Sequence, residues 1–184
     1  PPTWDFPSGK VLRLPAMAGR SDAELGTLLS LCKRLFIDNW QHITFGTCIQ
    51  GAVYELELSE QPQGFSMLDG YLTVVIPPGH SHLHLCIGPH QGLGKLKTPE
   101  AWQKKRPCAR AALFRNVSGG TCTPGSWGLQ LWNGAGEQML NVFLPSPFLD
   151  DAHRRTAPNW SRLALWNELR ARYLGETVPQ PHSA

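Results

Sequence analysis

Hydrophobic residues recur at helical spacing in two segments, one toward each end of the chain. The first segment follows Ser21, which can cap a helix and has Glu24 three residues further on. Its apolar positions predict a helix over residues 22–39: Leu25, Leu28, Leu29, Cys32, Leu35 and Phe36. The second segment predicts a helix from Pro158 or Asn159 to about Leu174, with Gly175 as its stop.

Between these segments, apolar and polar residues alternate with the period of two that is typical of strands. The pattern predicts strands over residues 11–14, 42–49, 52–59, 71–76, 82–87, 109–116, 127–133 and 138–144. Short joints predict two antiparallel hairpins, 71–76 with 82–87 and 127–133 with 138–144. A short helix is expected over residues 99–105, capped by Thr98.

This order of elements predicts an α+β fold with a mainly antiparallel sheet. The N-terminal and C-terminal helices are expected to cover one face of the sheet, and the other face would hold a pocket. A small cupin-like β-barrel with added helices is the alternative. We expect one domain over residues 1–184, with an extended arm at 1–9 and a flexible tail at 175–184.

Composition narrows the class of protein. A net charge of +3 in 184 residues is below what a dedicated nucleic-acid binder carries. No apolar run reaches the roughly 18 residues that a membrane span needs. Five cysteines without a C-x-x-C pair indicate reduced thiols and a cytoplasmic location. The chain does not begin with Met, so a removed leader stays open.

The candidate chemistry lies on the strand predicted over residues 82–87. His80, His82, His84 and Cys86 alternate with other residues, which places these four metal-competent side chains on one face. Neighbours two apart are about 6.6 Å apart along a strand, so an H-x-H pair could share one metal ion. His82 and His84 are the first choice for the pair.

A third ligand would have to come from elsewhere. His80 could curl back from its turn, and His90 could fold over from beyond Gly88-Pro89. Glu55 or Glu57 could complete a two-His-one-carboxylate set, although a solvated face is the plainer interpretation of both. Tyr71, on the neighbouring strand, could donate a proton, bind substrate or simply pack.

The stretch PPGHSHLH at residues 77–84 resembles the segment that supplies H-x-H ligands in cupins, where a metal sits inside a β-barrel. The resemblance covers fewer than ten residues. The glutamate that cupins carry a few positions after the second histidine is absent, because residues 87–90 read Ile-Gly-Pro-His. We therefore assign no family from this stretch.

Basic side chains follow the histidines. Seven of them stand against the single acid Glu100: Lys95, Lys97, Lys104, Lys105, Arg106, Arg110 and Arg115. The plainer interpretation is a solvated surface, but the run, with Lys95 and Lys97 as substrate-binding residues, could instead steer an anionic substrate towards the histidines or form a weak nucleic-acid patch. Trp132 could pack in the core, which is the plainer interpretation, or face a pocket and bind substrate there, and the irregular segment 88–107 could act as a lid.

Three functions compete. The first is a metal-dependent enzyme (oxidoreductase, lyase or hydrolase) acting on a small organic substrate, with iron, zinc, manganese or copper as Lewis acid or oxygen activator. The second is a non-catalytic metal-binding or haem-binding protein with one histidine as axial ligand. The third is metal-free acid–base chemistry by His and Cys. A homodimer is compatible with all three. The first two require His82 and His84 to project together into a sheltered hollow.

Overall fold

The computed structural model describes residues 11–12, 22–49, 51–116 and 125–177. The predicted arm at 1–9, residues 13–14 of the first predicted strand, the cap Ser21 and the tail from residue 178 lie outside the described residues. The side chains of Cys48 and Cys122 lie outside them as well.

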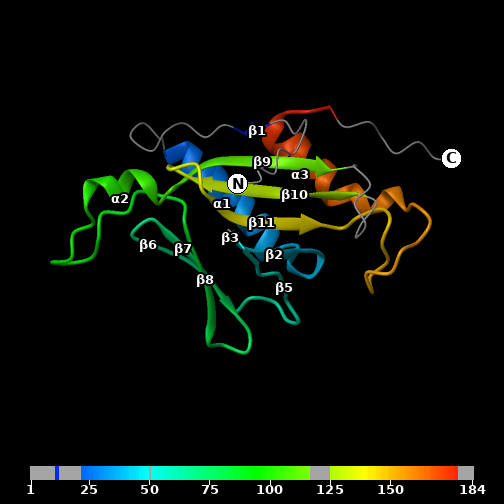
Figure 1. Ribbon diagram of the computed structural model, residues 1–184, viewed down its shortest axis with the longest axis horizontal. Helices are drawn as coiled ribbons and strands as arrows, with labels where there is room; N and C mark the ends of the chain where they lie inside the picture. Colours follow the sequence, from blue (N-terminus) through cyan, green and yellow to red (C-terminus); the bar gives the residue numbers. More distant parts are fainter. Residues whose placement is uncertain (1–10, 13–21, 50, 117–124, 178–184) are drawn as a thin grey trace.

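A six-stranded antiparallel sheet forms the centre of the fold (Figure 1). Its strands, in order across the sheet, are β1 (Val11–Leu12), β9 (Cys108–Asn116), β10 (Ser126–Asn133), β11 (Gln138–Leu144), β2 (Thr44–Gly46) and β5 (Leu56–Glu57). The hairpin predicted for β10 and β11 is confirmed, with Leu129 opposite Val142. Trp127, Leu129 and Leu131 belong to the core, and the intervening Gly128 and Gln130 are buried as well, so β10 is covered on both faces.

Two helices, α1 (Asp22–Phe36) and α3 (Ala164–Leu174), pack behind this sheet (Figure 1). The core forms where Leu28, Leu35 and Leu169 meet the buried side chains of the sheet. The helix α1 ends three residues before the predicted position 39. The side chain of Asn39 donates a hydrogen bond to the carbonyl of Arg34 (2.8 Å), which satisfies an acceptor at the end of the helix.

A second, three-stranded antiparallel sheet lies beside the first and carries the histidine strand (Figure 1). It consists of β6 (Gly64–Leu68), β7 (Tyr71–Ile76) and β8 (Ser81–Cys86). The predicted hairpin of β7 and β8 is confirmed, and β8 begins one residue earlier than expected. Strand β6 was not predicted, because its residues do not alternate regularly between apolar and polar: Met67 is followed directly by the apolar Leu68.

The two long strands predicted over 42–49 and 52–59 are wrong. Residues Trp40–His42 form a 3-10 turn, and the rest divides into β2, β3 (Cys48–Ile49), β4 (Ala52–Val53) and β5. The chain crosses itself closely here: a Cβ built on Gly46 would lie 1.6 Å from the carbonyl oxygen of Tyr54. Such a backbone approach requires glycine and interrupts both strands.

Two further helical segments of the described residues are α2 (Glu100–Lys105) and a 3-10 turn, η3 (Trp160–Leu163), that leads into α3. As predicted, Asn159 caps this C-terminal segment by accepting a hydrogen bond from Ser161, and Gly175 ends it with φ of +62°. The cap predicted for α2 is wrong, because Pro99 occupies that position and the Thr98 hydroxyl contacts His90 instead.

The α+β class with helices near both ends is confirmed. The cupin-like alternative is wrong for the part of the chain that the structure describes, because the central sheet stays open at the edge strands β1 and β5. None of the described helices is long and apolar enough to cross a membrane.

Candidate ligand-binding pocket

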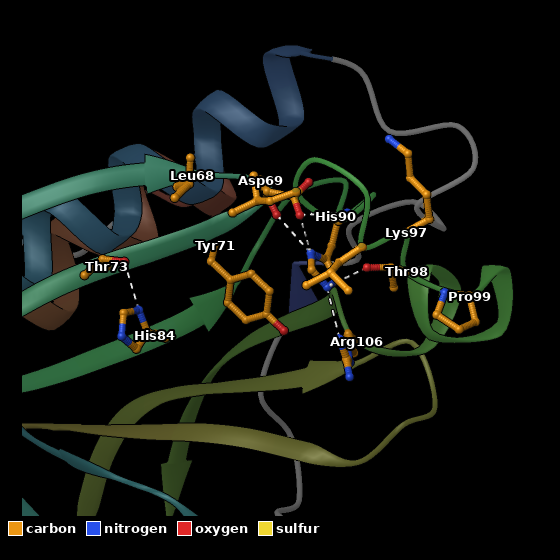
Figure 2. Close-up of a pocket in the computed structure, with 13 residues that line it drawn as sticks. Leu68, Asp69, Tyr71, Thr73, His84, His90, Lys97, Thr98, Pro99 and Arg106 are labelled. Carbon is orange, nitrogen blue, oxygen red and sulfur yellow. Dashed lines mark hydrogen bonds and ion pairs between the residues drawn. The ribbon is translucent and has the colours of Figure 1, made fainter.

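A pocket of about 490 Å³ lies between the β6–β8 sheet and the loop that follows it (Figure 2). The sheet side contributes Leu68, Asp69, Tyr71, Thr73 and His84. The other wall comes from the loop and from the end of α2: His90, Gly92, Leu93, Leu96, Lys97, Thr98, Pro99 and Arg106. The volume falls in the range of about 300–1,000 Å³ that small-molecule sites occupy.

Asp69 fastens the loop to the sheet. It lies in the tight turn between β6 and β7, with φ of +45°. Its carboxylate accepts hydrogen bonds from the backbone N–H groups of Gln91 (2.9 Å) and Gly92 (2.8 Å), and its Oδ2 lies 2.8 Å from Nδ1 of His90. These donors lower the pKa of Asp69, so the carboxylate is ionised at neutral pH.

His90 has both ring nitrogens engaged. Nδ1 faces Asp69, while Nε2 lies 3.0 Å from the Thr98 hydroxyl and 3.0 Å from a nitrogen of the Arg106 guanidinium. The ring of Tyr71 meets the imidazole edge to face, with centroids 4.9 Å apart. Burial raises the pKa of Tyr71, so its phenol is neutral at neutral pH.

His84 lines the pocket and has one ring nitrogen engaged. Its Nδ1 lies 2.9 Å from the hydroxyl of Thr73, its partner across the β7–β8 ladder. Its Nε2 makes no hydrogen bond within the residues that the structure describes. His82 lies on the same face, with its ring centroid 5.6 Å from that of His84, but it is exposed and does not line the pocket.

The predicted metal centre is wrong. His82 and His84 share a face as expected, but both rings are exposed rather than enclosed. His80 is exposed in the turn before β8, and the buried thiol of Cys86 points to the carbonyl of Gly88. No group of three or more His, Cys, Asp or Glu side chains among the described residues could hold a metal ion. The metal-dependent enzyme that rested on this centre is therefore wrong.

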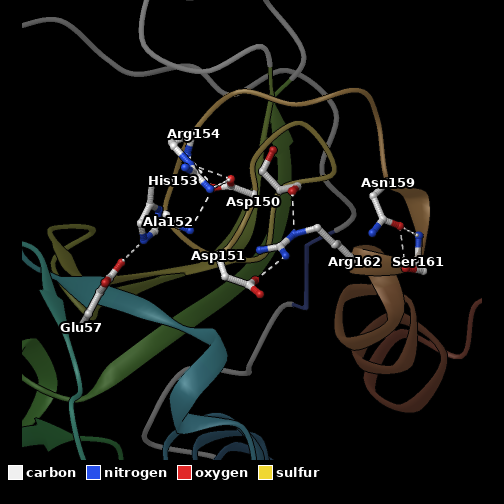
Figure 3. A network of polar contacts seen from close by, with 10 residues as sticks. Glu57, Asp150, Asp151, Ala152, His153, Arg154, Asn159, Ser161 and Arg162 are labelled. Carbon is white, nitrogen blue, oxygen red and sulfur yellow. Dashed lines mark hydrogen bonds and ion pairs between the residues drawn. The ribbon is translucent and has the colours of Figure 1, made fainter.

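The two glutamates proposed as a third ligand lie elsewhere. Glu55 is exposed between β4 and β5. Glu57 accepts a hydrogen bond from Thr44 and pairs with His153 at 2.7 Å, as part of the polar network around the loop that follows β11 (Figure 3). Neither glutamate is among the residues that line the pocket.

The predicted substrate-binding residues separate into two groups. Lys97 lines the pocket, as do Tyr71 and His90 from the predicted catalytic set, whereas Lys95 does not. Trp132 lies away from the pocket, with the guanidinium of Arg110 3.5 Å above its ring centroid. Sequence reasoning missed Asp69 and Thr98 as site residues, and it counted Arg106 only within the run of basic side chains that could steer an anionic substrate. The Asp69-Gly70 turn pair was the one available signal for the first of these.

Solved structures share this fold. This chain superimposes on a crystal structure of ChuX with a TM-score of 0.52 and 16% sequence identity. The superposition covers 92% of this chain and 79% of the ChuX chain. A second structure, described as the haem-binding protein ChuX, gives a TM-score of 0.50 at 16% identity and covers 92% of this chain and 80% of that one. At such identities the likeness establishes the fold alone.

Sequence comparison is more direct. No curated protein matches the chain. A family model described as "Family of unknown function (DUF7676)" matches residues 18–175, which span most of the 184 residues and include every strand from β2 onward. The chain therefore belongs to this family of unknown function, DUF7676.

Proposed function

We propose that the chain is a non-catalytic haem-binding protein and that the pocket between the β6–β8 sheet and the loop at residues 88–99 receives the haem. One of the structures that share its fold is described as a haem-binding protein. The observation that carries the proposal is His84, a pocket-lining imidazole with one nitrogen engaged and the other open.

His84 has the features of an axial ligand. A ligating histidine usually donates a hydrogen bond from its second ring nitrogen, which fixes the tautomer and the orientation of the ring. When Nδ1–H of His84 donates to Thr73, the lone pair of Nε2 is available for iron. The bound iron would supply the affinity of a metal–imidazole bond.

Neither of the other two candidates in the pocket suits iron equally well. Both nitrogens of His90 already have partners within 3.0 Å. Tyr71 would have to ligate as a phenolate, and burial raises its pKa. We therefore assign the iron to His84.

The apolar lining of the pocket fits a flat macrocycle. Leu68, Leu93 and Leu96 line the pocket and are 62%, 56% and 82% exposed, respectively. Three exposed leucines that line one pocket are costly unless something covers them, and covering apolar surface contributes about 25 cal/mol per Å². A porphyrin ring is an apolar surface of suitable shape.

The rim of the pocket carries positive charge. Lys97 and Arg106 line it, and neither pairs with a carboxylate within the described residues. Haem bears two carboxylate side chains, and charge-assisted hydrogen bonds to such groups are about twice as strong as neutral ones. The prediction of an anionic small-molecule ligand is thus retained, with haem as that ligand.

Titration of the untagged protein with haemin tests the proposal. We expect one equivalent to bind with a shifted Soret band. His84→Ala should abolish that spectrum, whereas His82→Ala, which removes a neighbouring exposed imidazole from the same strand, should leave it unchanged. Absence of saturable binding, or equal loss in both variants, would overturn the proposal.

One earlier expectation, the cytoplasmic location, accompanies it. The described thiol of Cys32 is free and buried, which supports a reducing compartment such as the cytoplasm. The homodimer and the metal-free acid–base function stay predictions.

A further inference from the structure

We infer that His90 and Arg106 together form a proton-coupled site for a carboxylate of the ligand. This inference deepens the proposed function and rests on it. It gives these two residues a role in binding the carboxylate, separate from the ligation of iron by His84.

Arg106 forms no ion pair with a carboxylate among the described residues. It lines the pocket, and its guanidinium lies 4.9 Å from the ring centroid of Trp102. Its polar contacts are with neutral acceptors, Nε2 of His90 at 3.0 Å and the phenol of Tyr71. Most of its five N–H donors are therefore left for a ligand.

The contact between His90 and Arg106 requires a neutral imidazole. Asp69 accepts from Nδ1–H, so the ring proton resides on the side away from Arg106. Nε2 then accepts a hydrogen bond from the guanidinium. Thr98, at 3.0 Å, can turn its hydroxyl to either role.

A second proton on His90 would change this geometry. Nε2–H would become a donor facing another donor at 3.0 Å, and two positive charges would stand side by side. A carboxylate placed between them would accept from both and neutralise one charge. Asp69 on the far side of the ring stabilises the imidazolium, so the proton and the carboxylate favour each other's binding.

The charged and titratable groups around the ring are few, which makes the coupling specific. Asp69 comes from the β6–β7 turn, Tyr71 from β7 and Arg106 from the end of α2, and Lys97 stands on the loop wall of the pocket. Among them only an imidazole ordinarily titrates near neutral pH, at about 6.5 when unperturbed.

The linkage has a definite direction. A ligand that bears carboxylates should bind more tightly as the pH falls through the ordinary titration range of an imidazole. One linked proton limits the gain to about tenfold per pH unit. A ligand whose carboxylates are esterified should show none of this gain.

The experiment compares haemin with its dimethyl ester at about pH 8 and about pH 5.5, a range that spans the ordinary titration of an imidazole. The proteins are the wild type, His90→Gln and Arg106→Gln. The variants serve as controls for the pH dependence of free haemin and of the iron ligand, which they share with the wild type. Arg106 is exposed, so its replacement should leave the fold intact even if His90→Gln does not.

We expect the affinity of the wild type for haemin to rise about tenfold more on acidification than that of either variant. For the dimethyl ester, the change of affinity on acidification should be the same in all three proteins. Equal pH dependence of haemin binding in all three proteins would overturn the carboxylate site and leave the haem proposal intact. Failure of both ligands to bind the wild type at either pH would instead overturn the proposed function itself.

Discussion

Arg34 on α1 and Glu168 on α3 form a bidentate ion pair. Nε of Arg34 donates to one carboxylate oxygen at 2.7 Å, and Nη2 donates to the other at 2.6 Å. Both side chains are about one-third exposed. This pair joins the two helices that pack behind the sheet, at positions 134 residues apart in the chain.

Glu168→Gln should therefore lower the stability of the fold. The substitution leaves an amide N–H facing a guanidinium donor and removes the negative charge, so we expect a loss of about 1 kcal/mol, near the upper end for partly exposed pairs. Urea unfolding measures it. Glu100→Gln is the matched control, because Glu100 pairs with Lys104 within one exposed helix turn and should show no measurable change. Equal losses of stability in Glu168→Gln and Glu100→Gln would mean that the pair between the helices contributes no more than an exposed pair within one helix.

Gly70 should tolerate alanine far less well than Gly136. Both have the same left-handed backbone, with φ of +78° and +77°. A Cβ on Gly70 would lie 2.2 Å from the carbonyl oxygen of Pro89, whereas one on Gly136 would meet nothing within 4 Å. We expect Gly136→Ala to cost about 1 kcal/mol from backbone strain alone. Gly70→Ala should cost about 1–3 kcal/mol more, because the loop must move.

Thermal unfolding of both variants provides the comparison. The carbonyl of Gly70 also accepts hydrogen bonds from the backbone N–H groups of Ile87 and Gly88. The clash would therefore lie where the pocket loop leaves β8. Haemin binding should weaken in Gly70→Ala and stay unchanged in Gly136→Ala. If the two variants were equally stable, the close approach of the backbone at Gly70 would be in error.

Asp69 should make the pocket loop sensitive to acid. Its pKa lies below the ordinary value of 3.8 because Gln91, Gly92 and His90 donate to the carboxylate. A lowered pKa means that the stabilisation is fully present above pH 3.8 and is lost as the pH falls through the folded-state value. Asp69→Asn should thus be less stable than the wild type at neutral pH, and the gap should narrow in acid.

Urea unfolding at about pH 7 and about pH 3 measures that gap. Hydrogen exchange adds a local readout: the amides of Gln91 and Gly92 should exchange faster in Asp69→Asn at neutral pH. The amide of Gly136, which donates to the carbonyl of Asn133 in another turn, should not change. A gap between wild type and variant that widened in acid would contradict the assigned direction.

Periodicity predicted most of the fold. The bounds of β7 (Tyr71–Ile76) and β11 (Gln138–Leu144) are those expected, because each strand buries alternate residues. The strands around Gly46 were not predictable, since their break depends on the carbonyl of Tyr54, which approaches from eight residues away. Local pattern cannot report such a crossing.

The candidate site was predictable only in part, for a related reason. A period of two correctly put His82 and His84 on one face, but it does not say whether that face is enclosed, and here it is open. The contacts that build the pocket join Asp69 to His90 and His90 to Arg106 across 21 and 16 residues. Contacts at such separations follow from the folded loop rather than from the spacing of the sequence.

Leu96 should matter for ligand binding and not for folding. It is 82% exposed, so Leu96→Ser should change the stability by no more than about 0.5 kcal/mol. If the macrocycle covers about half of this side chain, the substitution should weaken haemin binding by about 1 kcal/mol, or roughly fivefold. Haemin titration and thermal unfolding of the same preparation give both quantities. Val53→Ser is the matched control, because Val53 is 65% exposed on β4 and does not line the pocket. Equal weakening by both substitutions would indicate that haemin adsorbs to apolar surface in general, whereas an effect confined to Leu96 would place the macrocycle against the loop wall.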